Sequence, residues 1–131
     1  MSSRLGFGRL GFAPLVAVTL ALAASPARPQ GDADMQECDG STAEMVECLS
    51  RQAKIWDQRL NEAYQKLMQS VQGGQREKLR AAQRLWVQYR DANCAYYAAG
   101  EGTVSRVEAA ECMRSMTESR TGELDQAGGQ N

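Results

Sequence analysis

Apolar residues recur at steps of three and four from about position 42 onward, which is the spacing of one face of an α-helix. The sequence Ser41-Thr42-Ala43-Glu44 precedes this pattern. It has the form of a capping box, in which a hydroxyl and an acid three residues later bind the first free amides of a helix. A first helix is therefore predicted over 42–72. Its apolar positions are Met45, Leu49, Ala53, Trp56, Leu60, Ala63, Leu67 and Val71.

A second helical pattern follows the pair Gly73-Gly74, which is expected to end the first helix because glycine permits left-handed backbone geometry. This pattern predicts a helix over 75–98. Its repeating positions are Leu79, Ala82, Trp86, Tyr89, Asn93 and Tyr97. A link this short makes the two helices antiparallel neighbours.

A third helix is predicted after the connection Gly100-Glu101-Gly102. The sequence Ser105-Arg106-Val107-Glu108 repeats the capping-box pattern, and Met113, Met116 and Leu124 follow at helical spacing. No segment alternates with a period of two over β-branched residues, so no strand is expected. The predicted fold is all-α, a helical hairpin plus a third helix over 41–125. The small polar tail, 126–131, is expected to be disordered.

The N-terminal region has the composition of a cleavable signal peptide over 1–27. Arg4 and Arg9 precede an apolar run over 10–24, and small residues follow it. The run is shorter than the roughly 20 residues that span a bilayer, although an uncleaved N-terminal anchor is the alternative. Residues 28–40, which include Pro29 and Gly31, are predicted to be a flexible lead-in. After cleavage, no association with the membrane is expected.

Four cysteines follow the leader, Cys38, Cys48, Cys94 and Cys112. An even number of cysteines behind an export signal predicts two disulfides and a periplasmic or secreted location. On the predicted helices all four lie at the end opposite the Gly73-Gly74 turn, and the sequence leaves the three possible pairings open. A four-cysteine zinc site is the alternative, but such sites show closely spaced cysteine pairs that this chain lacks.

Composition favours binding over catalysis. The chain has no histidine, which removes the commonest general base and metal ligand, so neither a metal nor a cofactor is predicted. The leader holds two of the 15 basic residues and none of the 16 acids, which leaves a faintly acidic chain without a basic stripe for nucleic acid. Asp57, Glu62 and Asp91 could form a glycosidase pair only beside a deep cleft, which three short helices do not suggest. No enzyme activity is therefore expected.

Three ordered motifs carry a resemblance to a known family. The first helix holds Asp57, Leu60, Asn61 and Tyr64, and the third holds Cys112, Thr117, Arg120 and Leu124. Between them, the second helix holds Gln83, Trp86, Arg90, Asp91 and Cys94. Over about 38–124 this order resembles the LprI-type lysozyme-inhibitor family. The resemblance implies a small exported helical domain whose protein partner is lysozyme. The named inhibitor type is a lipoprotein, whereas this leader has no cysteine for lipid attachment.

The motif residues themselves favour a structural role. Asp57, Asn61, Gln83 and Arg90 are predicted to form a polar network that fixes helix register, with Trp56 and Trp86 in the core. A ligand site is the alternative interpretation of the same residues. The candidate partner-contact loop is Gly100, Glu101, Gly102 and Thr103, and the Gly73-Gly74 tip is the alternative. The favoured function is inhibition of lysozyme-type muramidases by occupation of their cleft. A non-enzymatic structural or partner-binding module of the cell envelope is the alternative.

Overall fold

The computed structural model describes residues 37–129, which form three helices and no strand: α2 (Thr42–Ser70), α3 (Gly73–Ala98) and α4 (Val104–Gly129). The predicted all-α class is therefore confirmed. The predicted signal peptide at 1–27 and most of the lead-in lie outside the described residues. No described helix is long and apolar enough to cross a membrane.

The helix α2 begins at the predicted capping box. The backbone N–H of Ser41 donates to Oε2 of Glu44 at 2.8 Å, and the backbone N–H of Glu44 donates to Oγ of Ser41 at 3.4 Å. These bonds satisfy amides that have no partner within the helix. The hydroxyl of Ser41 also donates to Glu44 at 2.6 Å, and these hydrogen bonds hold the pKa of the Glu44 carboxyl below its ordinary value of 4.5.

The Glu44 pKa leads to a prediction about pH. A carboxylate whose pKa is lowered by folding adds stability that is present above its unfolded pKa and is lost as pH falls through the folded value. We expect Glu44→Gln to lower the melting temperature above pH 4.5, and the difference from the native chain to shrink at lower pH. Melting curves recorded by circular dichroism from neutral pH to acid test this. A pH-independent difference between the two proteins would contradict it.

The turn between α2 and α3 lies two residues earlier than predicted. Residues Val71 and Gln72 form the connection, and Gly73, with φ +55°, is the first residue of α3. This left-handed conformation favours glycine, so the pair starts the second helix and does not separate the two. The guanidinium of Arg76 donates twice to the carbonyl oxygen of Met68, at 2.9 and 2.6 Å, and so ties the first turn of α3 to the last turns of α2.

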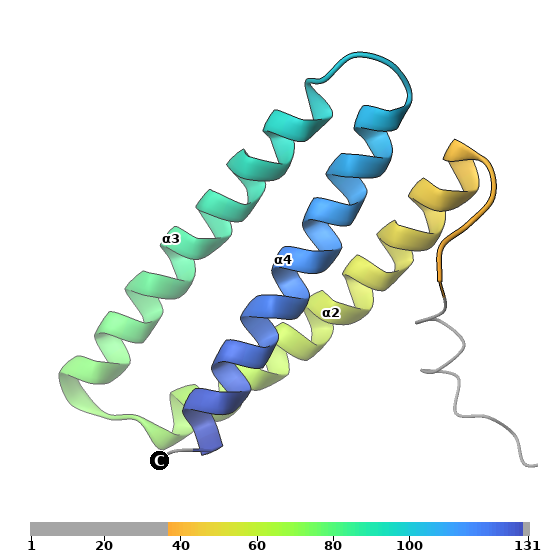
Figure 1. Cartoon of the computed structure of the whole chain (residues 1–131). Coiled ribbons are helices and arrows are strands. Elements are labelled where there is room, and N and C mark those ends of the chain that lie inside the picture. The colour runs from red at the N-terminus through yellow and green to blue at the C-terminus, as the bar shows by residue number, and fades with distance from the viewer. Residues whose placement is uncertain (1–36, 130–131) are drawn as a thin grey trace, which may run out of the picture.

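The third helix lies between the first two (Figure 1). The helices α2 and α3 run antiparallel, as predicted, but they diverge away from the turn, and the largest helix–helix interface joins α2 to α4. The buried core explains this arrangement. It lies near the turn and contains Leu60, Ala63, Leu67 and Val71 from the α2 side, closed by Leu124 of α4. The predicted packing of the first two helices as direct neighbours is therefore replaced by packing of each on α4.

The helix α4 begins before its predicted cap. It starts at Val104, so Ser105 lies inside the helix, where it is buried and donates its hydroxyl to the carbonyl of Gly102 at 2.8 Å. The other end of α4 continues to Gly129, into the segment predicted to be disordered. Because both α2 and α3 cover it, α4 buries small polar residues such as Thr117 and Thr121 and has no single apolar stripe.

The two disulfides pair cysteines that are neighbours in the sequence. Cys38 is bonded to Cys48 and Cys94 to Cys112, with Cα–Cα distances of 5.7 and 5.5 Å. Two disulfides were predicted without a pairing, and this is the pairing that the structure has. The first ties the lead-in to α2, and the second joins α4 to the part of α3 that lies away from the α2–α3 turn.

Candidate functional site

The motif residues of all three helices meet at Arg90. Its side chain is buried, and Nη1 donates to Oδ1 of Asp57 on α2 and to Oγ1 of Thr117 on α4, both at 3.2 Å. On its own helix, Nε donates to Oδ1 of Asp91 at 3.0 Å, and the guanidinium carbon lies 5.2 Å from the centre of the Trp86 ring. One side chain thus connects three helices, and its charge is balanced by two half-exposed carboxylates.

Gln83, another member of the predicted network, binds a second arginine. The amide oxygen of Gln83 accepts from Nε of Arg120 on α4 at 3.2 Å, and Arg120 also pairs with Glu123. Nδ2 of Asn61 donates to Oδ2 of Asp57 at 3.5 Å, and Tyr64 packs against the apolar core. The polar residues predicted as one group therefore form two clusters, both of which bind α4.

The two tryptophans have different surroundings. Trp86 packs against the core cluster, as expected, although it is only half-buried. Trp56 is also half-buried and lies outside the cluster, with the guanidinium of Arg59 4.7 Å from its ring centre. Its buried Nε1 has no hydrogen-bond partner within residues 37–129. The prediction that both rings fill the core is thus too simple for Trp56, because α4 closes the core farther along α2.

A cavity of about 500 Å³ lies between α2 and α4 beside Arg90. Ser50, Lys54, Asp57, Met113 and Thr117 are among the residues that line it. The guanidinium at this wall already binds two carboxylates and a hydroxyl, so it has little capacity left for an anionic ligand. Within the described part of the chain, no group of three or more His, Cys, Asp or Glu side chains is placed to hold a metal ion.

The contacts of Arg90 predict a loss of stability when it is replaced. We expect Arg90→Met to lower the free energy of unfolding by about 1–3 kcal/mol, since the hydrogen bonds to Asp57 and Thr117 are lost. Both carboxylates are half-exposed and can be hydrated, which limits the cost. Urea unfolding measures the effect. Arg84→Met is the matched control, because Arg84 is exposed on the same helix. Unchanged stability of Arg90→Met with loss of partner binding would instead indicate a ligand site.

The four residues of the candidate loop over 100–103 are all exposed, and the loop connects α3 to α4. Its geometry is fixed by the bond from the Gly100 N–H to the Tyr97 carbonyl at 3.1 Å, by Gly102 with φ +78°, and by the Ser105 hydroxyl. The sequence analysis did not identify the exposed apolar residues on the neighbouring helices. Every exposed large apolar residue of the described chain is on α3 or at the start of α4: Leu85, Tyr89, Tyr96, Tyr97 and Val104.

The apolar stripe predicted for α3 is wrong in part. Tyr89 is 61% and Tyr97 39% exposed, whereas Gln83, Arg90 and Cys94 are the buried residues of this helix. The motif positions therefore mark the inner face, and three of the tyrosines face solvent. The spacing of Leu85, Tyr89 and Tyr96 at four and seven residues, on the side away from Arg90, was the signal that could have identified this face.

Comparison with known proteins identifies a family. A family model described as lysozyme inhibitor LprI matches residues 33–124. The matched region contains the four cysteines, the Arg90 contacts and Leu124, so it covers most of all three helices. The curated proteins and the solved structures give no match.

Proposed function

The chain belongs to the LprI family of lysozyme inhibitors, and we propose on this basis that it binds a lysozyme-type muramidase and blocks its cleft. The observation that carries the proposal is the family match over residues 33–124. Inhibition by occupation needs no catalytic group in the inhibitor, only a stable surface that matches the enzyme.

The disulfides and the ordered loop of the domain support a binding role. Disulfides persist in oxidising compartments, so we place the protein in the periplasm or outside the cell. The Cys94–Cys112 bond holds the ends of α3 and α4 together next to the exposed loop over 100–103. A contact surface that is already ordered loses less conformational entropy on binding. We therefore include this loop in the proposed contact region.

A lytic assay tests the proposal. The purified protein, confirmed as oxidised by mass spectrometry, is titrated against several lysozymes acting on a suspension of peptidoglycan. We expect lysis of at least one to fall to zero near equal molar amounts. Occupation of the cleft also predicts competition, in which KM rises and kcat is unchanged. Full lysis by every enzyme at about 50 µM of folded protein would contradict lysozyme inhibition, because such binding would be weaker than any specific inhibitor requires.

The same protein samples distinguish lysozyme inhibition from the alternative role as a module of the cell envelope. A protein that leaves every lysozyme active but captures a specific partner from an envelope extract would fit a structural or partner-binding module. The captured partner would be identified by mass spectrometry, with the reduced and unfolded chain as the control for unspecific capture.

A further inference from the structure

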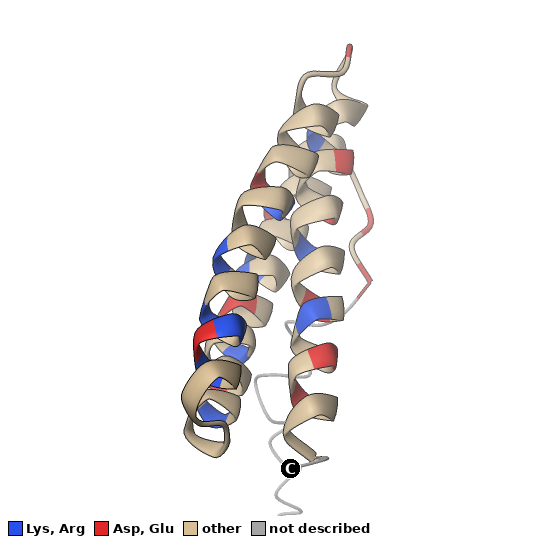
Figure 2. Ribbon diagram, turned by 90° about the vertical axis from the view of Figure 1, so that its left-hand side faces the viewer, with Lys and Arg blue, Asp and Glu red and all other residues tan. Residues whose placement is uncertain are grey.

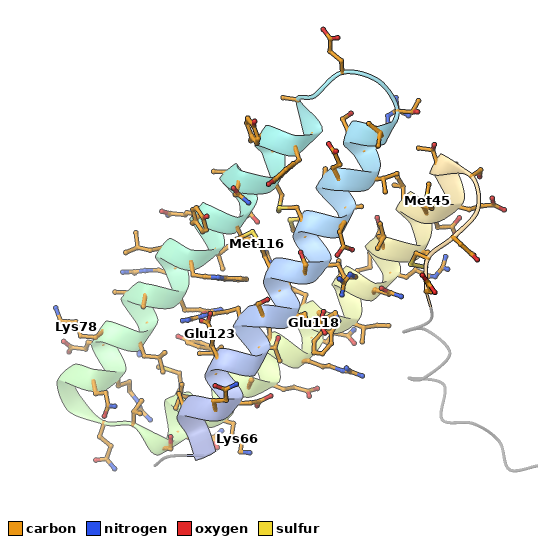
Figure 3. The ribbon with its side chains drawn as sticks, viewed as in Figure 1. Met45, Lys66, Lys78, Met116, Glu118 and Glu123 are labelled. Atoms are coloured by element: carbon orange, nitrogen blue, oxygen red, sulfur yellow. A yellow bond between two sulfur atoms is a disulfide. The ribbon has the colours of Figure 1, made fainter. Side chains whose placement is uncertain are left out.

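A groove runs along the interface of α3 and α4. Two cavities, of about 360 and 340 Å³, adjoin one another there and share Ser115 and Met116 in their walls. Met116 lies between the two helices (Figure 3). We call the two cavities together the α3–α4 groove. The half nearer the loop over 100–103 is lined by Tyr97, Glu108 and Glu111, and the other half by Trp86, Tyr89, Glu123 and Arg120.

One wall of the α3–α4 groove is aromatic. Trp86, Tyr89 and Tyr97 follow one another along α3, and Tyr96, which is 75% exposed, packs edge-on against Tyr97 with ring centres 5.3 Å apart. Exposed aromatic rings gathered on one helix are typical of protein interfaces, because tyrosine offers a large rigid contact area and a hydroxyl. No residue of α2 is among the exposed large apolar residues.

The other wall of the groove is acidic near the loop. Glu108 and Glu111 are the only charged residues that line this half. Arg114 donates to both carboxylate oxygens of Glu111, whereas Glu108 forms no ion pair among the described residues. The basic residues of α3 are concentrated in its other half, at Arg76, Lys78, Arg80 and Arg84 (Figure 2). The aromatic and acidic half of the groove is therefore free of lining cations.

The floor of the groove is held in place. Nδ2 of Asn93 lies 3.3 Å from Sδ of Met116 and 3.4 Å from Sγ of Cys112, and Cys112 is bonded to Cys94. The disulfide thus fixes the separation of the two walls. A cation entering this half would meet the carboxylate of Glu108 on one side and the ring of Tyr97 on the other, and both kinds of contact favour arginine or lysine.

From these observations we infer that the α3–α4 groove is the surface that holds the protein partner, and that its occupant is a partner segment bearing arginine or lysine. The cationic side chain lies between Tyr97 and the carboxylate of Glu108, since both oxygens of Glu111 are already held by Arg114. The identification of that partner as a lysozyme rests on the proposed function. A second groove, of about 460 Å³ between α2 and α3, is lined by Arg80 and Arg84 and has the wrong charge for this occupant.

Substitutions in the groove test this assignment in the intact oxidised protein. We expect Glu108→Lys and Tyr97→Ala each to raise the Kd for lysozyme by about tenfold or more. Glu62→Lys is the matched control, since Glu62 is exposed on α2 and undergoes the same charge reversal. It is expected to change Kd by less than about threefold. Thermal melts confirm that each variant is folded, which is expected because Tyr97 and Glu108 are both exposed.

A second experiment tests whether the groove binds a cationic segment, independently of which protein the partner is. Hexa-arginine peptide is titrated into the protein labelled with ¹⁵N, and amide shifts are followed. We expect the largest shifts at Asn93, Tyr97, Glu108 and Ser115, and their loss in Glu108→Lys. Inhibition of lysozyme that groove variants leave unchanged would overturn the inference and keep the proposed function. Peptide shifts centred on the groove without any lysozyme binding would keep the inference and refute the proposed function.

Two further outcomes would also overturn the inference. One is a set of peptide shifts centred on another face, such as the acidic residues of α2. The other is a dimer, measured by sedimentation, that Tyr97→Ala converts to a monomer, because a second copy of the chain would then be the occupant of the groove.

Discussion

Replacing both Cys94 and Cys112 with alanine is expected to lower the free energy of unfolding by about 3 kcal/mol, the value for a loop closed over a sequence separation of 18. The helix α3 has few direct contacts with α2, so its attachment depends on α4 and on this bond. In a domain of this size the loss corresponds to a fall in melting temperature of roughly 12–24 °C. Urea unfolding and calorimetry on the same variant measure it.

The other disulfide provides the control for this prediction. Replacing Cys38 and Cys48 with alanine opens a loop over a sequence separation of 10, but it frees only the lead-in and the start of α2. The freed segment gains entropy in the folded protein as well, which offsets part of the gain in the unfolded chain. We therefore expect a smaller loss of stability. Equal losses for the two double variants would contradict the view that the Cys94–Cys112 bond anchors α3.

Leu124→Ala is expected to lower the free energy of unfolding by about 3 kcal/mol, since deleting a buried leucine side chain loses transfer free energy and leaves a cavity. Leu124 is only 3% exposed and is the α4 residue that closes the buried cluster of Leu60, Ala63, Leu67 and Val71. The α2–α4 interface is the largest in the molecule, so little else compensates for the cavity. Urea unfolding measures the effect. The slope of the unfolding free energy against urea concentration is expected to stay unchanged.

An exposed leucine serves as the matched control. Leu85→Ala makes the same chemical change at a position that is 65% exposed on α3, and we expect it to alter stability by less than about 0.5 kcal/mol. If Leu124→Ala were as mild as Leu85→Ala, the cluster near the α2–α3 turn would not be the core of the domain.

Sequence patterns predicted α2 well because it buries one continuous face. Its apolar positions from Leu49 to Val71 are spaced for a single contact surface, and its first turn carries its own capping residues. Local chemistry is enough for both features. The start of α4 was predicted less well, because Ser105 has the sequence of a cap but its hydroxyl binds Gly102 from inside the helix.

The inner face of α3 could not be predicted from apolar spacing. It is occupied by Gln83, Arg90 and Cys94, and each needs a partner on another helix, which one sequence does not reveal. The apolar pattern therefore pointed to Tyr89 and Tyr97, which lie at the surface. The family motif on α3, which includes Gln83, Arg90 and Cys94, indicated the buried face of this helix more accurately than the spacing of its apolar residues.

The pairing of the cysteines and the position of α4 could not be predicted from the sequence for the same reason. Both depend on which helices touch, and a short link between α2 and α3 fixes only their direction. Once α4 lies between them, Cys94 meets Cys112, and Cys48 is left for Cys38. The predicted convergence of all four cysteines at one end was compatible with other pairings.

The central position of α4 also sets the order in which the structure can form. It is the last of the three helices in the sequence, so the inner faces of α2 and α3 have no partner until the residues around Leu124 have been synthesised. The growing chain can close the Cys38–Cys48 bond early, since both cysteines precede most of α2. The Cys94–Cys112 bond must wait for α4, and its formation then coincides with completion of the fold.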